Sequence, residues 1–255
     1  MSSRSWERFR IDEVGDGVVD LVIDRPDKLN AMDRLFFDEL IDVMDHVTHE
    51  PSIRVVVLAG EGRAFSAGGD IATFPALTLD VDAARAHVRV VFDAFHAVER
   101  AGVPVIAAVN GIAHGGGLEI LCAVDYTIAA EHATFGFRES AHGLVPGFGI
   151  VKGERKMGAA WTWRLVSTAE VIDVATAREI GVVQEIVAAD ALLDRAHELA
   201  AAAAANPASA LRSAKHLLNR DTDAGLVAAV ETTALLFGTN ETAELVDRFL
   251  GRPRG

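Results

Sequence analysis

Three glycines followed by a glutamate form the first segment whose residue types suggest chemistry. Residues 110–119 read Asn-Gly-Ile-Ala-His-Gly-Gly-Gly-Leu-Glu. Glycines lack a Cβ, so their backbone N–H groups can approach a bound molecule closely. Apolar residues follow Glu119, which predicts a buried helix and a carboxyl pKa raised toward neutrality by desolvation. Such a carboxyl group can give and take protons, although a tight turn and a Glu paired with a buried Arg would explain the same residues without chemistry.

A second glycine turn, Gly68-Gly69-Asp70, follows another apolar run. Residues 54–60 and 103–109 each precede a glycine turn and predict buried strands, because they are too apolar to alternate. In a parallel sheet, both turns would lie at the carboxyl ends of strands, where α/β folds bind ligands. Two N–H donors from such turns could converge on one oxygen as an oxyanion hole, in which one donor contributes ~3 to 4 kcal/mol.

Other chemistries have weaker support in the sequence. Neither glycine turn ends in Gly-Lys-Ser/Thr, and the first does not fit the Gly-x-Gly-x-x-Gly pattern. His-Glu-x-x-His and paired cysteines are missing too, so we expect no metal. Ser66 lacks the Gly-x-Ser-x-Gly elbow of a hydrolase, and Cys122 has the apolar neighbours of a packing residue. His114 and His142 lie near glycine turns, where a structural role and a ligand contact both remain open.

Composition indicates a globular protein with one sizeable core and a smaller appended unit, since half of its 255 residues are apolar. A formal net charge of −13 without a basic stripe argues against nucleic-acid binding. A phosphorylated small ligand remains compatible, because it needs only a few local cations and oriented N–H groups. The longest uncharged stretch, residues 101–118, is broken by Pro104 and glycines, so we expect no membrane span. The start lacks an apolar signal segment, and we therefore expect a cytoplasmic protein.

Strands and helices are expected to alternate in the first half of the chain and helices to dominate the second. Strand, helix, strand order implies parallel pairing through right-handed crossovers. The alanine run at 200–205 predicts a helix that ends at Asn206-Pro207. Apolar residues of the last two helices would pack on the protein's own core or on another subunit. Strands are expected at 18–24, 54–60, 103–109, 125–130 and 182–187, and helices at 33–49 (with Asp33 as N-cap), 80–100, 151–157, 160–166, 175–180, 190–205, 207–219, 224–236 and 240–250.

Both glycine segments resemble the two signature segments of the crotonase superfamily, the enoyl-CoA hydratase/isomerase family. They are residues 63–71, Arg-Ala-Phe-Ser-Ala-Gly-Gly-Asp-Ile, and residues 108–119, which begin Ala-Val-Asn-Gly. The resemblance covers nearly the whole chain, from residues 24–31 to residues 249–253. It implies an α/β fold, a crotonase-like spiral of ββα repeats over residues 1–190, and a helical C-terminal trimerisation region over residues 191–255. It also implies a homotrimer or a dimer of trimers.

The resemblance assigns roles to individual residues. The N–H groups of Gly69 and Gly116 would form the oxyanion hole for a thioester oxygen, and Glu119 and Glu139 match the two catalytic glutamates of the hydratases. Coenzyme A would arrive as part of an acyl-CoA substrate, without a separate cofactor. Lys28 would be the nearest cation for a phosphate, and Arg252 is a looser match for a similar role across a subunit boundary. Substrate contacts would come from Lys28, Leu29, Ala31, Ala67, Gly68, Asp70, Ile71, His142 and Gly147.

The two glutamates favour hydration of a 2-enoyl-CoA, as in fatty acid metabolism. One glutamate would deprotonate water for attack at Cβ, and the other would deliver a proton to Cα, which two carboxyl groups in unlike environments can do. Family isomerases commonly manage with a single glutamate at the second position. The alternatives are therefore an isomerase or C–C hydrolase of the same superfamily, or an acyl-CoA-binding protein without turnover.

Three departures from the family pattern lie on the expected wall of the acyl pocket. Phe137-Arg138 replaces the usual Gln-Pro before Glu139, which places a cation beside that carboxylate and predicts a lowered pKa. Residues 148–153 replace the usual Gly-Gly-Thr-Gln-Arg-Leu, and His142 stands where an aliphatic residue is common. Because the departures fall on the acyl pocket, they leave substrate length and the exact reaction open.

Overall fold

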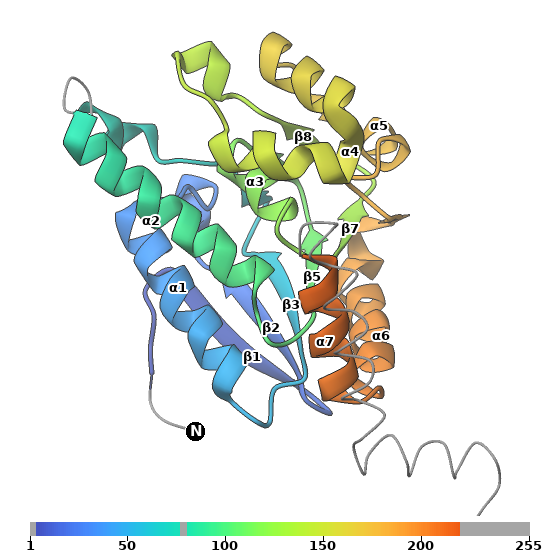
Figure 1. Ribbon diagram of the computed structural model, residues 1–255. Helices are drawn as coiled ribbons and strands as arrows, with labels where there is room; N and C mark the ends of the chain where they lie inside the picture. The colour runs from blue at the N-terminus through green and yellow to red at the C-terminus, as the bar shows by residue number, and fades with distance from the viewer. Residues whose placement is uncertain (1–3, 77–80, 220–255) are drawn as a thin grey trace, which may run out of the picture.

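The computed structural model describes residues 4–76 and 81–219, which form two β-sheets with helices packed around them (Figure 1). The larger sheet has the strand order β1-β2-β3-β5-β7-β10 and the smaller one β4-β6-β8-β9. The strands are β1 (Phe9–Gly15), β2 (Val18–Ile23), β3 (Val55–Gly60), β4 (Ala64–Ser66), β5 (Val105–Val109), β6 (Ile112–His114), β7 (Tyr126–Ala130), β8 (Thr134–Gly136), β9 (Ile172–Asp173) and β10 (Glu185–Val187).

Pairs of strands followed by a helix recur along the chain. The pairs β1–β2, β3–β4, β5–β6 and β7–β8 precede α1, α2, α3 and α4, so the expected ββα repeats are present. From the second repeat on, the first strand of each pair joins the larger sheet and the second joins the smaller one. The helices are α1 (Arg34–His49), α2 (Val81–Glu99), α3 (Gly116–Leu121), α4 (Gly147–Thr168), α5 (Val174–Glu179), α6 (Leu192–Ala204) and α7 (Ala208–Leu218), with short 3-10 turns η1 (Pro26–Lys28), η2 (Ile71–Ala76), η3 (Glu139–His142) and η4 (Ala189–Ala191).

Parallel pairing, as predicted, joins β2, β3, β5, β7 and β10. The first strand, β1, pairs antiparallel with β2 and was not predicted. Its sequence, Phe-Arg-Ile-Asp-Glu-Val-Gly, is mostly exposed, because β1 forms an edge of the sheet and buries little of its length. Strand β3, in contrast, is buried on both faces, which explains why its sequence does not alternate.

The larger sheet is covered on both faces by helices (Figure 1). On β3, Val56 and Leu58 belong to the main core, which includes the buried residues of α1. Val55 and Val57 point to the other face, where α6 packs. The buried positions of α6 recur every fourth residue, so they form one stripe along the helix. These positions are Leu192, Ala196, Ala200 and Ala204. The alanine run therefore forms part of the face with which α6 packs against the sheet.

The long elements agree with the prediction, and differences concentrate at short ones. Helix α1 begins after Asp33, whose carboxylate accepts a hydrogen bond from the Phe36 N–H at 2.9 Å. Helix α4 begins at Gly147, before the predicted start at residue 151, and joins two predicted helices across a break at Gly158 (φ 78°). The predicted strand at 182–187 is confined to β10, and β4, β6, β8 and β9 were not predicted.

Some predictions fall on residues outside the described ranges. These are the helices at 224–236 and 240–250 and the role of Arg252. The proposed division into residues 1–190 and 191–255 stays a prediction. Within residues 4–76 and 81–219, no helix has both the length and the apolar content needed to span a bilayer.

Candidate active site

The two glycine turns lie against one another. Strands β4 and β6 pair in parallel in the smaller sheet, so the turns that follow them leave the same edge. A Cβ placed on Gly68 would lie only 2.7 Å from the His114 carbonyl oxygen and 3.1 Å from the Gly116 nitrogen. Gly68 also has φ 91°, a conformation that L side chains rarely adopt. Glycine is therefore required here, both for the backbone shape and for the contact between the turns.

Each turn presents a backbone N–H group that could bind an oxyanion. Met32 forms a parallel bridge with Gly69, in which the Met32 N–H donates to the Gly68 carbonyl at 2.9 Å and the Asp70 N–H donates to the Met32 carbonyl at 2.9 Å. Successive N–H groups of an extended chain point to opposite sides, so the Gly69 N–H faces away from Met32. Gly116 begins α3, where N–H groups lack partners within the helix. Neither N–H has a hydrogen-bond partner within the described residues.

Glu119 is held by the first turn of α4. It lies on α3 with 7 % of its surface exposed, and the Gly149 N–H donates to its Oε1 at 2.9 Å. Burial and, to a smaller extent, the nearby Glu139 carboxyl group raise the pKa of Glu119, hydrogen bonds from the Gly149 and Phe148 N–H groups oppose both effects, and the net result is a pKa of about 8. Among the described residues no Arg pairs with Glu119, which removes the structural alternative of a buried ion pair.

Glu139 is the second carboxyl group of the site. It begins η3, and a Cβ placed on Gly115 would lie 2.9 Å from its Oε1, so the side chain packs against the second glycine turn. Its Oε2 is buried and has no hydrogen-bond partner within the described part of the chain. Burial raises the pKa of Glu139, and backbone N–H groups of Glu139 and Arg138 oppose that effect.

The prediction that Arg138 lowers the pKa of Glu139 is wrong. The guanidinium group of Arg138 donates to the Ala169 carbonyl instead, and Arg138 is exposed. Consecutive side chains here leave the backbone in different directions, so closeness in sequence brings no ion pair. Desolvation therefore dominates at Glu139 and favours its protonated form.

The two carboxyl groups act as a pair, since Glu139 contributes to the raised pKa of Glu119. Two buried carboxyl groups that repel each other as anions titrate in two separate steps. Because the pKa values of both groups are raised, the range in which they exchange protons lies closer to neutral pH than for ordinary glutamates. Two such groups in unlike environments can serve as an acid and a base.

Hydrogen bonds of two buried polar side chains hold the first glycine turn in place. Asn30 adopts φ 56°, its Oδ1 accepts a hydrogen bond from the Arg25 N–H at 2.9 Å, and its Nδ2 donates to two carbonyl groups at 3.0 and 2.7 Å. The Ser66 hydroxyl donates to the Asn30 carbonyl at 2.7 Å and accepts from the Gly68 N–H at 3.1 Å. Both hydrogen bonds of Ser66 are structural, which explains why this serine lacks a nucleophile's surroundings.

Replacing Asn30 by Ala should lower the free energy of unfolding by about 3 kcal/mol, because three backbone groups lose their partner at a buried position and each such loss costs ~1 to 3 kcal/mol. Urea unfolding followed by circular dichroism measures this change. Asn206→Ala is the matched control, since the amide of Asn206 also donates to backbone carbonyl groups but lies at an exposed position. A loss in the Asn30 variant no larger than in this control would contradict the assigned role.

The predicted substrate contacts fall into two groups. The first surrounds η1 and the first glycine turn, which are joined by the Ala67 N–H donating to the Leu29 carbonyl at 2.9 Å. The Asp70 carboxylate pairs with Arg25 at 2.8 Å and accepts from the Ala72 N–H, so it holds the turn and caps η2. Exposed side chains in this group are Lys28 and Ile71. The second group lies on the fourth repeat and comprises His142, which is exposed, and Gly147, the first residue of α4.

His114 has a structural partner in the fold. Its Nε2 lies 3.1 Å from the Thr134 hydroxyl on the neighbouring strand β8. Burial lowers the pKa of His114, and the charge of Arg138 lowers it further, so the ring is neutral near pH 7. The histidine beside the glycine turn therefore joins two strands and is unsuited to supply a positive charge.

Sequence reasoning missed two features that shape the site. The Met32 Sδ would lie 3.0 Å from a Cβ placed on Gly116, so this side chain packs against the second donor. The Phe148 and Gly149 N–H groups, which hold Glu119, were missed because the helix was placed four residues too late. Pro146-Gly147, the N-cap and first residue of α4, is a signal that could have found them, because this dipeptide marks a turn and the first N–H groups of a helix have no partner within the helix.

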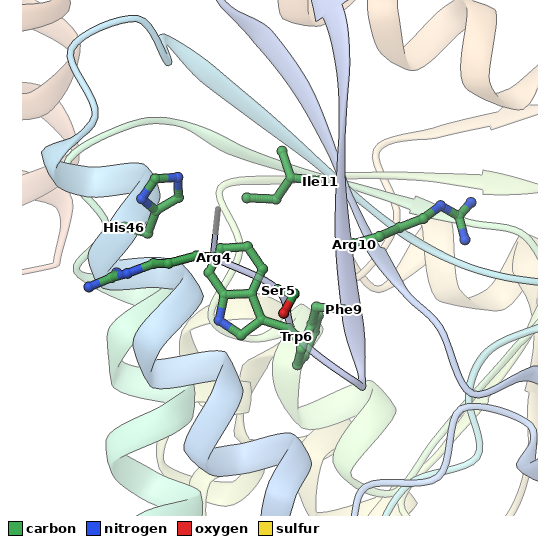
Figure 2. Close-up of a pocket in the computed structure, with 7 residues that line it drawn as sticks. All are labelled: Arg4, Ser5, Trp6, Phe9, Arg10, Ile11 and His46. Carbon is green, nitrogen blue, oxygen red and sulfur yellow. The ribbon is translucent and has the colours of Figure 1, made fainter. Parts of the chain in front are cut away.

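A separate hollow of about 330 Å³ lies between the N-terminal segment, β1 and α1 (Figure 2). Trp6 fills much of this view, while Arg10 points away from the indole (Figure 2). Carboxylates already pair with its cations: Arg4 with Asp42 at 3.4 Å, and Arg10 with acidic groups at 2.6 to 3.1 Å. Over residues 4–76 and 81–219, no three His, Cys, Asp or Glu side chains are grouped to hold a metal ion.

Fold and site together define a protein of ββα repeats in which two adjoining glycine turns lie beside two carboxyl groups with raised pKa values. Residues 13–249 match the model of the enoyl-CoA hydratase/isomerase family. The chain belongs to this family and has the fold of the crotonase superfamily.

Curated relatives and solved structures support the same family. The chain is 32 % identical to crotonyl-CoA hydratase of Syntrophomonas wolfei, over 90 % of both chains. It is 35 % identical to the (7aS)-7a-methyl-1,5-dioxo-2,3,5,6,7,7a-hexahydro-1H-indene-carboxyl-CoA hydrolase of Mycobacterium tuberculosis, over 80 % of this chain and 81 % of the relative. The crystal structure of an enoyl-CoA hydratase from Mycobacterium smegmatis superposes with a TM-score of 0.91 at 27 % identity and covers 97 % of this chain and 98 % of that one.

Proposed function

We propose that this protein is an enoyl-CoA hydratase, which adds water across the 2,3 double bond of a 2-enoyl-CoA. The observation that carries the proposal is the pair of carboxyl groups next to the glycine turns, buried Glu119 and half-buried Glu139, whose pKa values are both raised. A protein that only bound acyl-CoA would gain nothing from burying two acids, because desolvated carboxyl groups are unfavourable without partners. Hydratase relatives over most of the chain support the same reaction.

The proposed mechanism uses the oxyanion hole and the shared proton of the pair. The Gly69 and Gly116 N–H groups would donate to the thioester oxygen and stabilise the negative charge that develops as water attacks Cβ. The ionised carboxylate takes a proton from the attacking water, and the protonated carboxyl group delivers its proton to Cα. One proton is taken up and one is released, so the pair again holds one proton after each turnover.

Binding of the coenzyme A portion is assigned to the segment around η1. Lys28 is exposed at the end of this turn and would contact a phosphate, while the neighbouring backbone around Leu29, Ala31 and Ala67 would line the coenzyme A site. We extend the proposal to a cytoplasmic homotrimer or dimer of trimers that needs no separate cofactor. Analytical ultracentrifugation of the purified full chain tests the assembly.

The second candidate is a C–C hydrolase or double-bond isomerase that uses the same enolate. Its support is the Mycobacterium tuberculosis relative, whose name is that of a hydrolase acting on an indene-carboxyl-CoA. The products distinguish the candidates: a hydratase forms a 3-hydroxyacyl-CoA from crotonyl-CoA, whereas an isomerase moves the double bond without taking up water. Mass spectrometry of the product after reaction in ¹⁸O-labelled water separates these outcomes.

The direct test follows the loss of conjugated-thioester absorbance with crotonyl-CoA and longer 2-enoyl-CoAs. Glu139→Gln should lower kcat by about 100 to 1000 fold, because general acid–base catalysis typically contributes 10² to 10⁴ fold. Exposed Glu13→Gln, remote on β1, is the matched control and should retain the wild-type rate. Absence of turnover by the wild-type protein at every chain length would refute the hydratase proposal, and tight binding without any product would indicate a binding protein.

A further inference from the structure

A buried ion pair joins the end of α2 to the beginning of α4. Glu99, the last residue of α2, has 5 % of its surface exposed. The Lys152 Nζ on α4 lies 2.6 Å from its Oε1, and the His96 Nδ1 lies 3.0 Å from its Oε2. A carboxylate buried to this extent is stable only when its oxygens have partners, so breaking one of the contacts must disturb the others.

Both partners of Glu99 are linked to the turn of α4 that holds the proposed catalytic carboxyl group, Lys152 as a residue of the same helix and His96 through a ring contact. Lys152 follows Gly149 by three residues and therefore lies on the same face of the helix, one turn away. The His96 ring packs edge-on against Phe148, with ring centroids 5.3 Å apart. The N–H groups of Phe148 and Gly149 are the ones that donate to the Glu119 carboxylate.

The end of α2 is itself fixed from the opposite side by α7. The Lys215 Nζ donates to the Val98 carbonyl at 3.3 Å and to the Asp125 carboxylate at 2.7 Å, and its charge also acts on Glu99. The Asn219 amide donates to the Glu99 carbonyl at 2.8 Å. Charged and titratable groups therefore face Glu99 from α2, α4 and α7. Because the Glu99 backbone is held by α7 and Asn219, the ion pair of its side chain with Lys152 restrains the position of α4.

We propose that Glu99 is a positioning residue of this enzyme. Through Lys152 and His96 it fixes the first turn of α4, so that the Phe148 and Gly149 N–H groups remain on the Glu119 carboxylate. This inference rests on the proposed function of Glu119 in proton transfer. It gives a specific role to a buried charge 20 residues before Glu119 in the chain.

The test is Glu99→Gln, which keeps the shape of the side chain and removes its charge. We expect kcat toward crotonyl-CoA to fall about 10 to 100 fold with KM changed less than about twofold, because small misplacements of reacting groups cost up to 10² fold. The N–H groups of α4 lower the pKa of Glu119, so their loss should shift the alkaline limb of the kcat profile to higher pH. Glu185→Gln is the matched control, since it removes an ion pair with Arg195 far from α4 and should change neither quantity.

Two further variants separate positioning from general damage to the fold. Lys152→Met should reproduce the shift of the alkaline limb, whereas Lys152→Arg keeps the charge and should retain the wild-type limb. ¹³C NMR titration of labelled glutamate measures the Glu119 pKa without any turnover, so the inference stays testable even if the protein is no hydratase. An unchanged Glu119 pKa in the folded Glu99→Gln and Lys152→Met variants would overturn the inference, whatever their activity.

Discussion

Glu119→Gln is expected to lower kcat toward crotonyl-CoA by about 1000 fold or more. Gln keeps the volume of the side chain but neither releases nor accepts a proton, and general acid–base groups contribute up to ~10⁴ fold. Initial rates from the loss of thioester absorbance check this result. The Glu13→Gln variant on β1 serves again as the control, because it makes the same change at a residue remote from the site. A rate of the Glu119→Gln variant within tenfold of wild type would show that Glu119 carries no essential proton.

The pH dependence of the wild-type enzyme should be bell-shaped in kcat. Activity requires the singly protonated carboxyl pair, so it falls at low pH, where both groups are protonated, and at high pH, where both are ionised. The alkaline limb should lie near the Glu119 pKa of about 8, and it should disappear in the Gln variant. A wild-type profile that keeps rising through pH 9 would contradict the shared proton.

Glu119→Gln should not destabilise the protein at alkaline pH. Because the folded-state pKa of Glu119 is raised from 4.5 to about 8, the folded protein binds more protons than the unfolded chain between these values. Stability therefore falls as pH rises through this window, and a Gln at this position escapes the loss. Thermal unfolding at pH 9 should show the variant at least as stable as wild type, so unfolding cannot explain its lost rate.

Gly68→Ala is expected to lower kcat/KM by about 100 fold, the second large effect. The added Cβ would lie 2.7 Å from the His114 carbonyl oxygen and 3.1 Å from the Gly116 nitrogen, so the two glycine turns must move apart. Loss of one hydrogen-bond donor to the oxyanion removes ~3 kcal/mol of transition-state stabilisation, which corresponds to about 100 fold in rate. Steady-state kinetics with crotonyl-CoA measure the change.

Gly158→Ala is the matched control for this substitution. Gly158 has φ 78°, close to the φ 91° of Gly68, but nothing lies within 4 Å of a Cβ placed there. Both variants therefore suffer the backbone strain of a left-handed conformation, about 1 kcal/mol, and only Gly68→Ala also separates the turns. If both variants lost the same activity, backbone strain would explain the result and the contact between the turns would not.

Long periodic segments of the fold could be predicted from sequence, while short ones could not. Helices α1 and α2 and strands β3 and β5 each carry enough apolar residues to reveal their type. Strands β4, β6 and β8 have three residues each, too few to display a period, although they form most of the smaller sheet. The ββα spiral therefore came from the resemblance of two motifs and not from strand patterns.

The site shows the same division between local and tertiary information. Glycine turns and the burial of Glu119 could be inferred locally, because glycines and apolar neighbours are visible in sequence. The hydrogen bond from the Gly149 N–H to Glu119 joins residues 30 positions apart, and only the packing of α3 against α4 reveals it. The wrong expectation for Arg138 has the same origin, since its partner is the distant Ala169 carbonyl.

The pairing of neighbouring strands in the smaller sheet also bears on the distance between the proposed donors. Gly69 follows β4 and Gly116 follows β6, and these strands pair directly. Paired strands lie about 4.8 Å apart. An oxygen that accepts two N–H bonds of about 2.9 Å at a trigonal angle needs donor nitrogens separated by nearly that same distance. The direct pairing of β4 with β6 thus starts both turns at a separation that suits two donors to one oxygen.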